Sequence, residues 1–267
     1  MTAQPTIPPI SSLPLILLIH GAWHVQAHYT PLVSALTRAG FPVLAPLMPT
    51  SNTPTPAATT LDDDVVFIRS LTKKAIGAGH KVVALMHSYG GVVGSYALTG
   101  LDGVVGLVYM TSFIPFEGES LAGIFGGTLP PFLSCNAETG CVGIEDPGRM
   151  FYDDLSEEER ERYAGLLVPH SVKAEHESVT DDGVLRETGG RMAWREEGRK
   201  VGYLVCTEDK ALVEWVQRMM LERVNQEWGK EGKGRKMWIW EVESGHSPML
   251  RCPERVVECV QEFVEEL

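Results

Sequence analysis

Short apolar runs of β-forming residues alternate with longer segments of helical periodicity along most of the chain. The runs expected to form strands are 15–20, 42–47, 81–87, 104–111, 201–206 and 237–242. The segments expected to form helices are 29–39, 60–78, 89–99, 210–226 and 253–265. Strands that are apolar throughout and separated by helices are typical of a parallel sheet covered on both faces. The pattern therefore predicts an α/β protein with about six mostly parallel strands.

Residues 115–199 interrupt this alternation with Gly/Pro-rich loops and polar stretches. We expect a single domain whose core is built from residues 13–114 and 200–267. The inserted residues 115–199 would form a cap over the carboxyl ends of the strands, where ligands bind in open α/β sheets. The charged run 153–162 within this insertion is interpreted as a solvated helix face.

Candidate chemistry is concentrated in His87-Ser88-Tyr89-Gly90-Gly91, which follows the third strand run and leads into a helix. A serine on such a tight strand-to-helix turn exposes its hydroxyl above the sheet, an arrangement called a nucleophile elbow. The two glycines suit a turn with strained backbone angles and close strand–helix contact. Met86 departs from the usual motif, which has glycine two residues before the serine. The alternative is that Ser88 only caps the helix that follows.

Three further strand ends carry the partners that a nucleophilic serine needs. His20-Gly21-Ala22 follows the first strand, Glu208-Asp209 follows the fifth, and Gly245-His246 follows the last. Nucleophile, acid and histidine occur in the chain order expected with a nucleophile elbow. The predicted catalytic residues are Ser88, Asp209 and His246, with the backbone N–H groups of Ala22 and Tyr89 as the oxyanion hole.

Three other carboxylates in the sequence are alternatives to Asp209 as the acidic member of the triad. Glu208 is adjacent to Asp209, and either carboxylate could reach the histidine. Some hydrolases take the acid from a position after the preceding strand, where Glu117 and Glu119 are the candidates.

Other side chains near these motifs have less definite roles. We expect His87 to be a packed, hydrogen-bonded residue and His20 to brace the oxyanion turn. Trp23 and His24 are candidates for lining the substrate pocket, with plain packing as the alternative.

These segments resemble those of α/β-hydrolases in the branch that contains plant methyl salicylate esterases and hydroxynitrile lyases. The resemblance covers most of residues 13–114 and 200–267. The matching segments are His20-Gly21-Ala22-Trp23-His24, His87-Ser88-Tyr89-Gly90-Gly91, Cys206-Thr207-Glu208-Asp209-Lys210-Ala211 with Gln217-Arg218, and Gly245-His246 with Met249-Leu250. The resemblance favours Asp209 as the acid. It implies a serine hydrolase that cleaves an ester, lactone or thioester of a small hydrophobic metabolite through an acyl-enzyme, without a cofactor.

Two other classes of function are weighed against ester hydrolysis. In the hydroxynitrile lyases of this branch, a threonine stands at the position of Gly21 and a lysine at that of Ser247, so cyanohydrin cleavage is not expected here. Hydrolytic carbon–carbon cleavage uses the same triad and stays open. A non-catalytic small-molecule receptor is the third class, and the complete triad argues against it.

Composition limits the partners and the compartment. The chain has 267 residues and a formal net charge of −12, which argues against nucleic acid and anionic membranes as partners. No apolar run approaches the roughly 20 residues of a membrane span, and residues 1–14 lack the pattern of a signal peptide. Five cysteines are expected to be reduced thiols, and Cys135 and Cys141 lack companions at metal-ligand spacing. We therefore expect a cytoplasmic protein with a small-molecule substrate and no metal, and a homodimer stays open.

Overall fold

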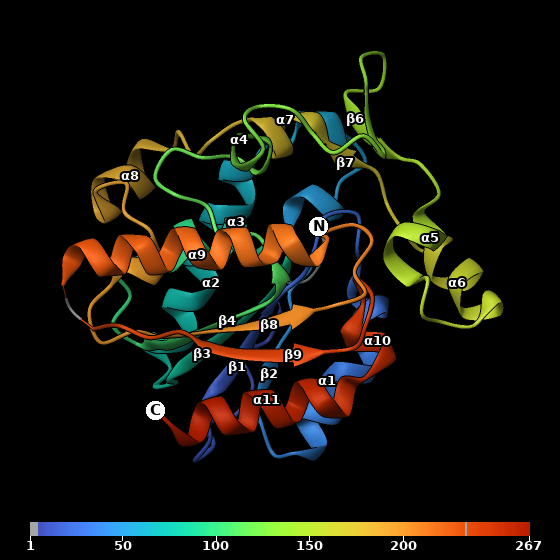
Figure 1. Cartoon of the computed structure of the whole chain (residues 1–267). Coiled ribbons are helices and arrows are strands. Elements are labelled where there is room, and N and C mark those ends of the chain that lie inside the picture. The colour runs from blue at the N-terminus through green and yellow to red at the C-terminus, as the bar shows by residue number, and fades with distance from the viewer. Residues whose placement is uncertain (1–4, 233) are drawn as a thin grey trace.

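The computed structural model describes residues 5–232 and 234–267, which are organised around a six-stranded sheet (Figure 1). The strands in spatial order are β2 (Val43–Leu44), β1 (Leu15–Ile19), β3 (Val82–Ser88), β4 (Val104–Ser112), β8 (Lys200–Cys206) and β9 (Trp238–Val242). Every pairing in this sheet is parallel, so the carboxyl ends of the strands lie along one edge. The prediction of an α/β fold with six parallel strands is confirmed. The second strand is shorter than its predicted run, because only two of its residues pair.

Both faces of the sheet are buried, which explains why the strands are apolar throughout. In β1, Leu15, Leu17 and Ile19 belong to the hydrophobic core on one face, while Ile16 and Leu18 belong to the core on the other face. Figure 1 shows one helix layer on each side of the sheet. The first layer contains α2 (Leu61–Gly77), α3 (Gly90–Ala97) and α9 (Glu214–Glu231), and the second contains α1 (Thr30–Arg38) and α11 (Pro253–Glu265).

The chain between β4 and β8, called here the inserted segment (residues 115–199), adds short elements on the side of the sheet opposite α1 and α11 (Figure 1). Its helices are α4 (Leu121–Ile124), α5 (Pro147–Tyr152), α6 (Glu157–Ala164), α7 (Val172–His176) and α8 (Asp182–Thr188). It also contains an antiparallel sheet of β5 (Leu133–Asn136), β6 (Cys141–Ile144) and β7 (His170–Ser171), which the sequence did not predict. The remaining short elements are α10 (Pro248–Arg251) and 3₁₀ turns at Gln26–Tyr29, Pro49–Ser51, Pro56–Ala58 and Ala193–Arg195.

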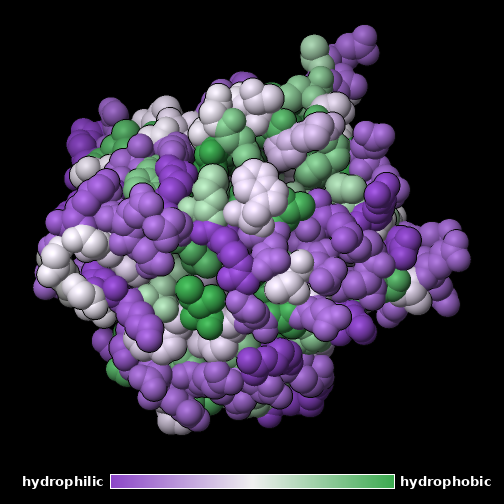
Figure 2. Space-filling view, viewed as in Figure 1, coloured by the Kyte–Doolittle hydropathy of each residue, from purple (hydrophilic) through white to green (hydrophobic). Residues whose placement is uncertain are grey.

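The surface of the inserted segment is polar where α6 projects into solvent. Glu157, Glu158 and Glu159 in the first turn of α6 are all exposed. Figure 2 shows this corner almost entirely in the colour of hydrophilic residues. Within the part of the chain that the structure describes, no helix combines the length and the apolar character needed to cross a bilayer.

The packing of α3 explains the departure at Met86. A Cβ atom added to Gly94 of α3 would lie 2.2 Å from Met86 Sδ, and both residues are fully buried. The helix therefore makes room for the large side chain on β3 by having a glycine opposite it. The small residue that an elbow usually has on the strand is here found on the helix.

We expect Gly94→Ala to lower the free energy of unfolding by about 1–3 kcal/mol, because the added methyl group overpacks a filled space. Denaturant unfolding would measure this loss. Met86→Ala should reduce the penalty of Gly94→Ala in a double-mutant cycle, since it removes the clashing side chain. Gly77→Ala is the matched control, since a Cβ at Gly77 meets nothing within 4 Å. Additive effects of Gly94→Ala and Met86→Ala would contradict the proposed compensation.

Candidate active site

The residues predicted to carry the chemistry meet at the carboxyl edge of the sheet. Ser88 ends β3, and the loops that follow β1, β8 and β9 carry Ala22, Asp209 and His246. Parallel strands bring these four strand ends to one edge although they are distant in sequence. The arrangement gives a single cluster above the centre of the sheet.

Ser88 has the strained backbone that the sequence motif predicts for an elbow. Its φ of 52° lies in the left-handed region, which is uncommon for a residue other than glycine. A Cβ at Gly90 would lie 2.3 Å from the Ile19 carbonyl oxygen, and one at Gly91 would lie 2.3 Å from that of Phe113. Because the turn passes so close to two neighbouring strands, glycine is required at both positions.

The carbonyl of Ser88 is anchored to the neighbouring strand β4. It accepts hydrogen bonds from Ser112 Oγ at 2.7 Å and from the Phe113 N–H at 3.2 Å. These bonds compensate for the strained backbone and fix the direction of the side chain.

Ser88, His246 and Asp209 form a continuous hydrogen-bonded chain. Ser88 Oγ lies 3.0 Å from His246 Nε2, and His246 Nδ1 lies 2.7 Å from Asp209 Oδ2. With its N–H on Nδ1, the neutral imidazole leaves Nε2 free to accept the serine proton. All three side chains are buried.

Asp209 is held rigidly in this position by other groups. Thr111 Oγ1 donates to its Oδ2 at 2.5 Å, and the N–H groups of Ala211 and Leu212 each donate to Oδ1 at 2.8 Å. With the bond from His246, the carboxylate accepts four hydrogen bonds and keeps one orientation. Thr111, which the sequence analysis did not single out, is thus part of the site.

The rival carboxylates point elsewhere. The Glu208 side chain is exposed, and the carboxylate that His246 bonds to is that of Asp209. Glu117 pairs with Arg195 at 2.6 Å, and Glu119 pairs with an arginine of α9 at 2.6 Å. The geometry selects Asp209 among the four candidates.

The N–H groups of Ala22 and Tyr89 are positioned to bind an oxyanion. Ala22 lies in the turn after β1, and Tyr89 precedes the first residue of α3. Neither N–H donates to a backbone or side-chain acceptor in residues 5–232 and 234–267. Two free donors beside the nucleophile, one at a helix N-terminus, are the elements of an oxyanion hole.

A hydrogen-bond relay links this turn to the histidine loop through His87. The Gly21 N–H donates to Tyr29 Oη at 2.8 Å, and Tyr29 Oη donates to His87 Nδ1 at 2.7 Å. His87 Nε2–H donates in turn to the His246 carbonyl at 2.8 Å. Burial lowers the pKa of His87 well below its usual range, so the ring stays neutral and keeps one donor and one acceptor. His87 is therefore a positioning residue.

Two more buried histidines hold the carbonyls of the same turn. His20 Nδ1–H donates to the Gly21 carbonyl at 2.9 Å, and His24 Nδ1–H donates to the Ala22 carbonyl at 2.7 Å. Burial lowers the pKa of His20 to about 4 and that of His24 well below its usual range. His20 thus sits where it can brace the turn as expected.

A small apolar cavity lies directly over Ser88 and His246. Its volume is about 20 Å³, enough for roughly one water molecule. The described residues that line it are Ala22, Trp23, Ser88, Tyr89, Phe113, Leu121, Pro130, Phe132, Leu133, Phe151, Glu175, Ala211, Leu212 and His246. Trp23 lines this cavity, but His24 does not, because its second ring nitrogen lies against Tyr152 at 3.1 Å and its side chain is fully buried.

Asp154 is another residue of the site that the sequence interpretation missed. Its Oδ2 accepts hydrogen bonds from the Gly245 N–H at 2.7 Å and from Ser244 Oγ at 3.0 Å, immediately before His246. The expectation of a solvated helix face over residues 153–162 is wrong for Asp154, which is half-buried and bonded to the loop before His246. Nothing in the local pattern separates it from the exposed glutamates of α6.

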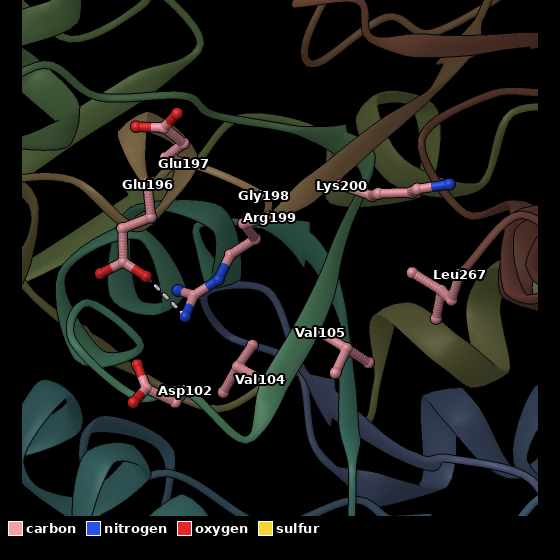
Figure 3. A pocket seen from close by; sticks show the side chains of 9 residues that line it. All are labelled: Asp102, Val104, Val105, Glu196, Glu197, Gly198, Arg199, Lys200 and Leu267. Atoms are coloured by element: carbon pink, nitrogen blue, oxygen red, sulfur yellow. Dashed lines mark ion pairs between the residues drawn. The ribbon is translucent and has the colours of Figure 1, made fainter.

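A second hollow lies at the opposite end of the sheet and has a different character. It lies near the amino ends of β4 and β8, beside Asp102, Val104 and Lys200 (Figure 3). Its buried cation, Arg199, pairs with Glu196 and donates to the carbonyls of Leu98 and Leu101. Because this guanidinium is occupied by protein partners, we assign the chemistry to the carboxyl edge.

Comparison with known proteins agrees with this fold and layout. The family model described as the alpha/beta hydrolase family matches residues 16–259, and the chain belongs to this family. A probable hydrolase, R7, of Phoma sp. is 28% identical over 257 residues, covering 94% of this chain and 98% of that protein. The alpha/beta hydrolase nvfD of Aspergillus novofumigatus is 28% identical over 260 residues, covering 93% and 95%.

Solved structures share the fold over nearly the whole chain. Polyneuridine aldehyde esterase has a TM-score of 0.70 at 22% identity, with 94% of this chain and 99% of that chain covered. The methylesterase MES16 from Arabidopsis has a TM-score of 0.67 at 19% identity, with 96% and 100% covered. At these identities the likeness establishes the architecture.

We expect Asp209→Asn to reduce kcat by about 10⁴, because the amide can no longer fix the required tautomer of the histidine. Steady-state kinetics on an activated ester would measure this. Glu208→Gln is the matched control and should leave kcat within about twofold, since its side chain is exposed. Equal losses in the two variants would contradict the assignment of Asp209.

We expect Tyr29→Phe to lower kcat by about tenfold with little change in KM, because it breaks the relay between the oxyanion turn and His87. Tyr96→Phe removes a single hydrogen bond, to the Glu119 carbonyl, and serves as the control. If both variants lost activity equally, the relay would have no special role in positioning the site.

Proposed function

We propose that the protein is a carboxylic-ester hydrolase that acts through a serine acyl-enzyme. The observation that carries the proposal is the hydrogen-bonded chain from Ser88 through His246 to Asp209 at the base of an apolar cavity. A serine, a histidine and a carboxylate hydrogen-bonded in this sequence of contacts carry out acyl transfer on several unrelated folds. The esterase names of the structural neighbours are consistent with this reading.

The reaction would proceed in two steps. Ser88 Oγ attacks the ester carbonyl carbon while His246 Nε2 takes the serine proton, and the carbonyl oxygen becomes an oxyanion between the N–H groups of Ala22 and Tyr89. Collapse of the tetrahedral intermediate breaks the ester bond, and His246 gives its proton to the departing alcohol. Water then attacks the acyl-enzyme by the same route and releases the acid.

Ester hydrolysis fits the oxyanion turn better than cyanohydrin cleavage. A Cβ at Gly21 would lie 2.9 Å from His87 Nδ1 and 3.1 Å from Ser88 Cβ. The hydroxyl-bearing side chain that the lyases have at this position therefore has no space beside His87. Ser247, the residue after the histidine, carries no positive charge to hold a leaving cyanide.

Ser88→Ala tests the proposal directly. We expect hydrolysis of p-nitrophenyl acetate to fall by about 10⁴-fold or more, because the variant has no nucleophile. Ser70→Ala, an exposed serine on α2, is the control and should keep full activity. A fluorophosphonate probe should add one label to the native protein and none to Ser88→Ala.

Two outcomes would contradict the proposal. One is Ser88→Ala retaining a tenth of the native activity. The other is release of cyanide from mandelonitrile above the buffer rate in a Ser88-dependent manner, which would favour a lyase.

A further inference from the structure

The cavity above Ser88 contains one carboxylate that the mechanism does not use. Glu175 of α7 lines this cavity, and its side chain has a relative exposure of 0%. Within the described residues, neither of its oxygens makes a hydrogen bond. Burying a carboxylate without hydrogen-bond partners is costly, so an otherwise apolar pocket would not be expected to retain one without a use for it.

Among the described residues, His170 at the start of β7 is the one that lies within ion-pair distance of Glu175. Its Nε2 lies 3.0 Å from Glu175 Oε1, and its side chain is also fully buried. The two groups are close enough for electrostatic attraction, but neither ring nitrogen of His170 makes a hydrogen bond in the described structure. His170 therefore lies beside Glu175 but leaves the acceptor capacity of the carboxylate unsatisfied.

The other polar side chains of the cavity already have hydrogen-bond partners. Ser88 and His246 bond to each other, and the Tyr89 hydroxyl donates to Asp64 Oδ2 at 3.1 Å. Asp64 in turn accepts two bonds from Thr50, through its N–H and its hydroxyl. Among the described lining residues, only Glu175 has buried side-chain acceptors without a hydrogen-bond partner.

We propose that Glu175 is a substrate-recognition residue whose carboxylate accepts a hydrogen bond from a hydroxyl or amine group of the ester. The inference rests on the proposed ester hydrolysis, because it places the donor group on a molecule whose carbonyl is at Ser88. The favoured substrate is a mainly apolar ester with one hydrogen-bond donor, matching a cavity that is apolar except at this point. A site built to bind a donor discriminates strongly against an analogue that lacks it, since the buried acceptor is then left unpaired.

Matched esters test this preference. Methyl mandelate and phenylglycine methyl ester carry a donor on the acyl side, and methyl O-methylmandelate is their non-donor counterpart. On the alcohol side, 2-hydroxyethyl butyrate is compared with 2-methoxyethyl butyrate. We expect kcat/KM to favour the donor ester by about tenfold or more in at least one of the two sets. Ratios within twofold in both sets would overturn the proposal.

Two substitutions at Glu175 separate recognition from a structural role. Glu175→Met keeps the length of the side chain but removes the acceptor, and should abolish the donor preference without lowering the thermal midpoint. Glu175→Gln retains one acceptor oxygen and should keep part of the preference. Glu177→Gln, two residues away and exposed, is the control and should behave as the native protein. An unchanged donor ratio in Glu175→Met would overturn the proposal.

The proposed function is checked in the same series by p-nitrophenyl acetate, which has no donor group. Its Ser88-dependent hydrolysis should be the same in the native protein and in Glu177→Gln to within about threefold, and it should remain measurable in Glu175→Met. Loss of the donor preference with this activity retained is the result expected for a recognition residue. Absence of Ser88-dependent hydrolysis in the native protein would instead contradict the ester hydrolase itself.

Discussion

The close contact between the Ser88 turn and its two neighbouring strands is the constraint on which the rest of the site depends. Gly90 lies against the end of β1 and Gly91 against the end of β4, with no space for a Cβ at either residue. A backbone with a φ of 52° costs on the order of 1–3 kcal/mol, and the bonds from Ser112 and Phe113 hold it in place. Because the turn is fixed to both strands, the loops that follow them have fixed positions relative to Ser88 Oγ.

Buried neutral histidines connect the sheet to the loops and help to fix the positions of those loops. His20, His24 and His87 each bond to the backbone of the oxyanion turn or of His246. Desolvation lowers the pKa of all three, so they connect loops without adding positive charge beside His246. A lysine or arginine in such places would perturb the proton transfer of the proposed mechanism. Imidazole supplies one donor and one acceptor at fixed angles and avoids this conflict.

The sequence predicted the sheet, the elbow and the strand-end residues because each has a local signal. An apolar run predicts a buried strand, and the Ser-x-Gly-Gly pattern after it predicts the tight turn at Ser88. The pairing of Gly94 with Met86 has no local signal, because it joins a helix to the strand before it through packing alone.

The inserted segment was much less predictable. The strands β5 to β7 are two to four residues long and partly exposed, so no apolar periodicity marks them. Asp154 and Glu175 belong to polar stretches in which most side chains are solvated. Their importance comes from what lies opposite them in space, which composition and spacing do not encode.

The attachment of the inserted segment connects access to the cavity with the oxyanion turn. The Trp23 indole N–H donates to the Val142 carbonyl at 3.1 Å, and the Trp23 carbonyl accepts from the Val168 N–H at 2.9 Å. Trp23 directly follows Ala22 and has a φ of 61°, so its backbone has little freedom to adjust. A cavity of about 20 Å³ must widen to admit an ester, and the segment that carries Phe132, Phe151 and Glu175 forms much of its wall. A movement of the inserted segment that carries Val142 and Val168 away from Trp23 would break these two bonds or displace the turn that contains Ala22. Such a movement would therefore couple substrate entry to the geometry of the proposed oxyanion hole.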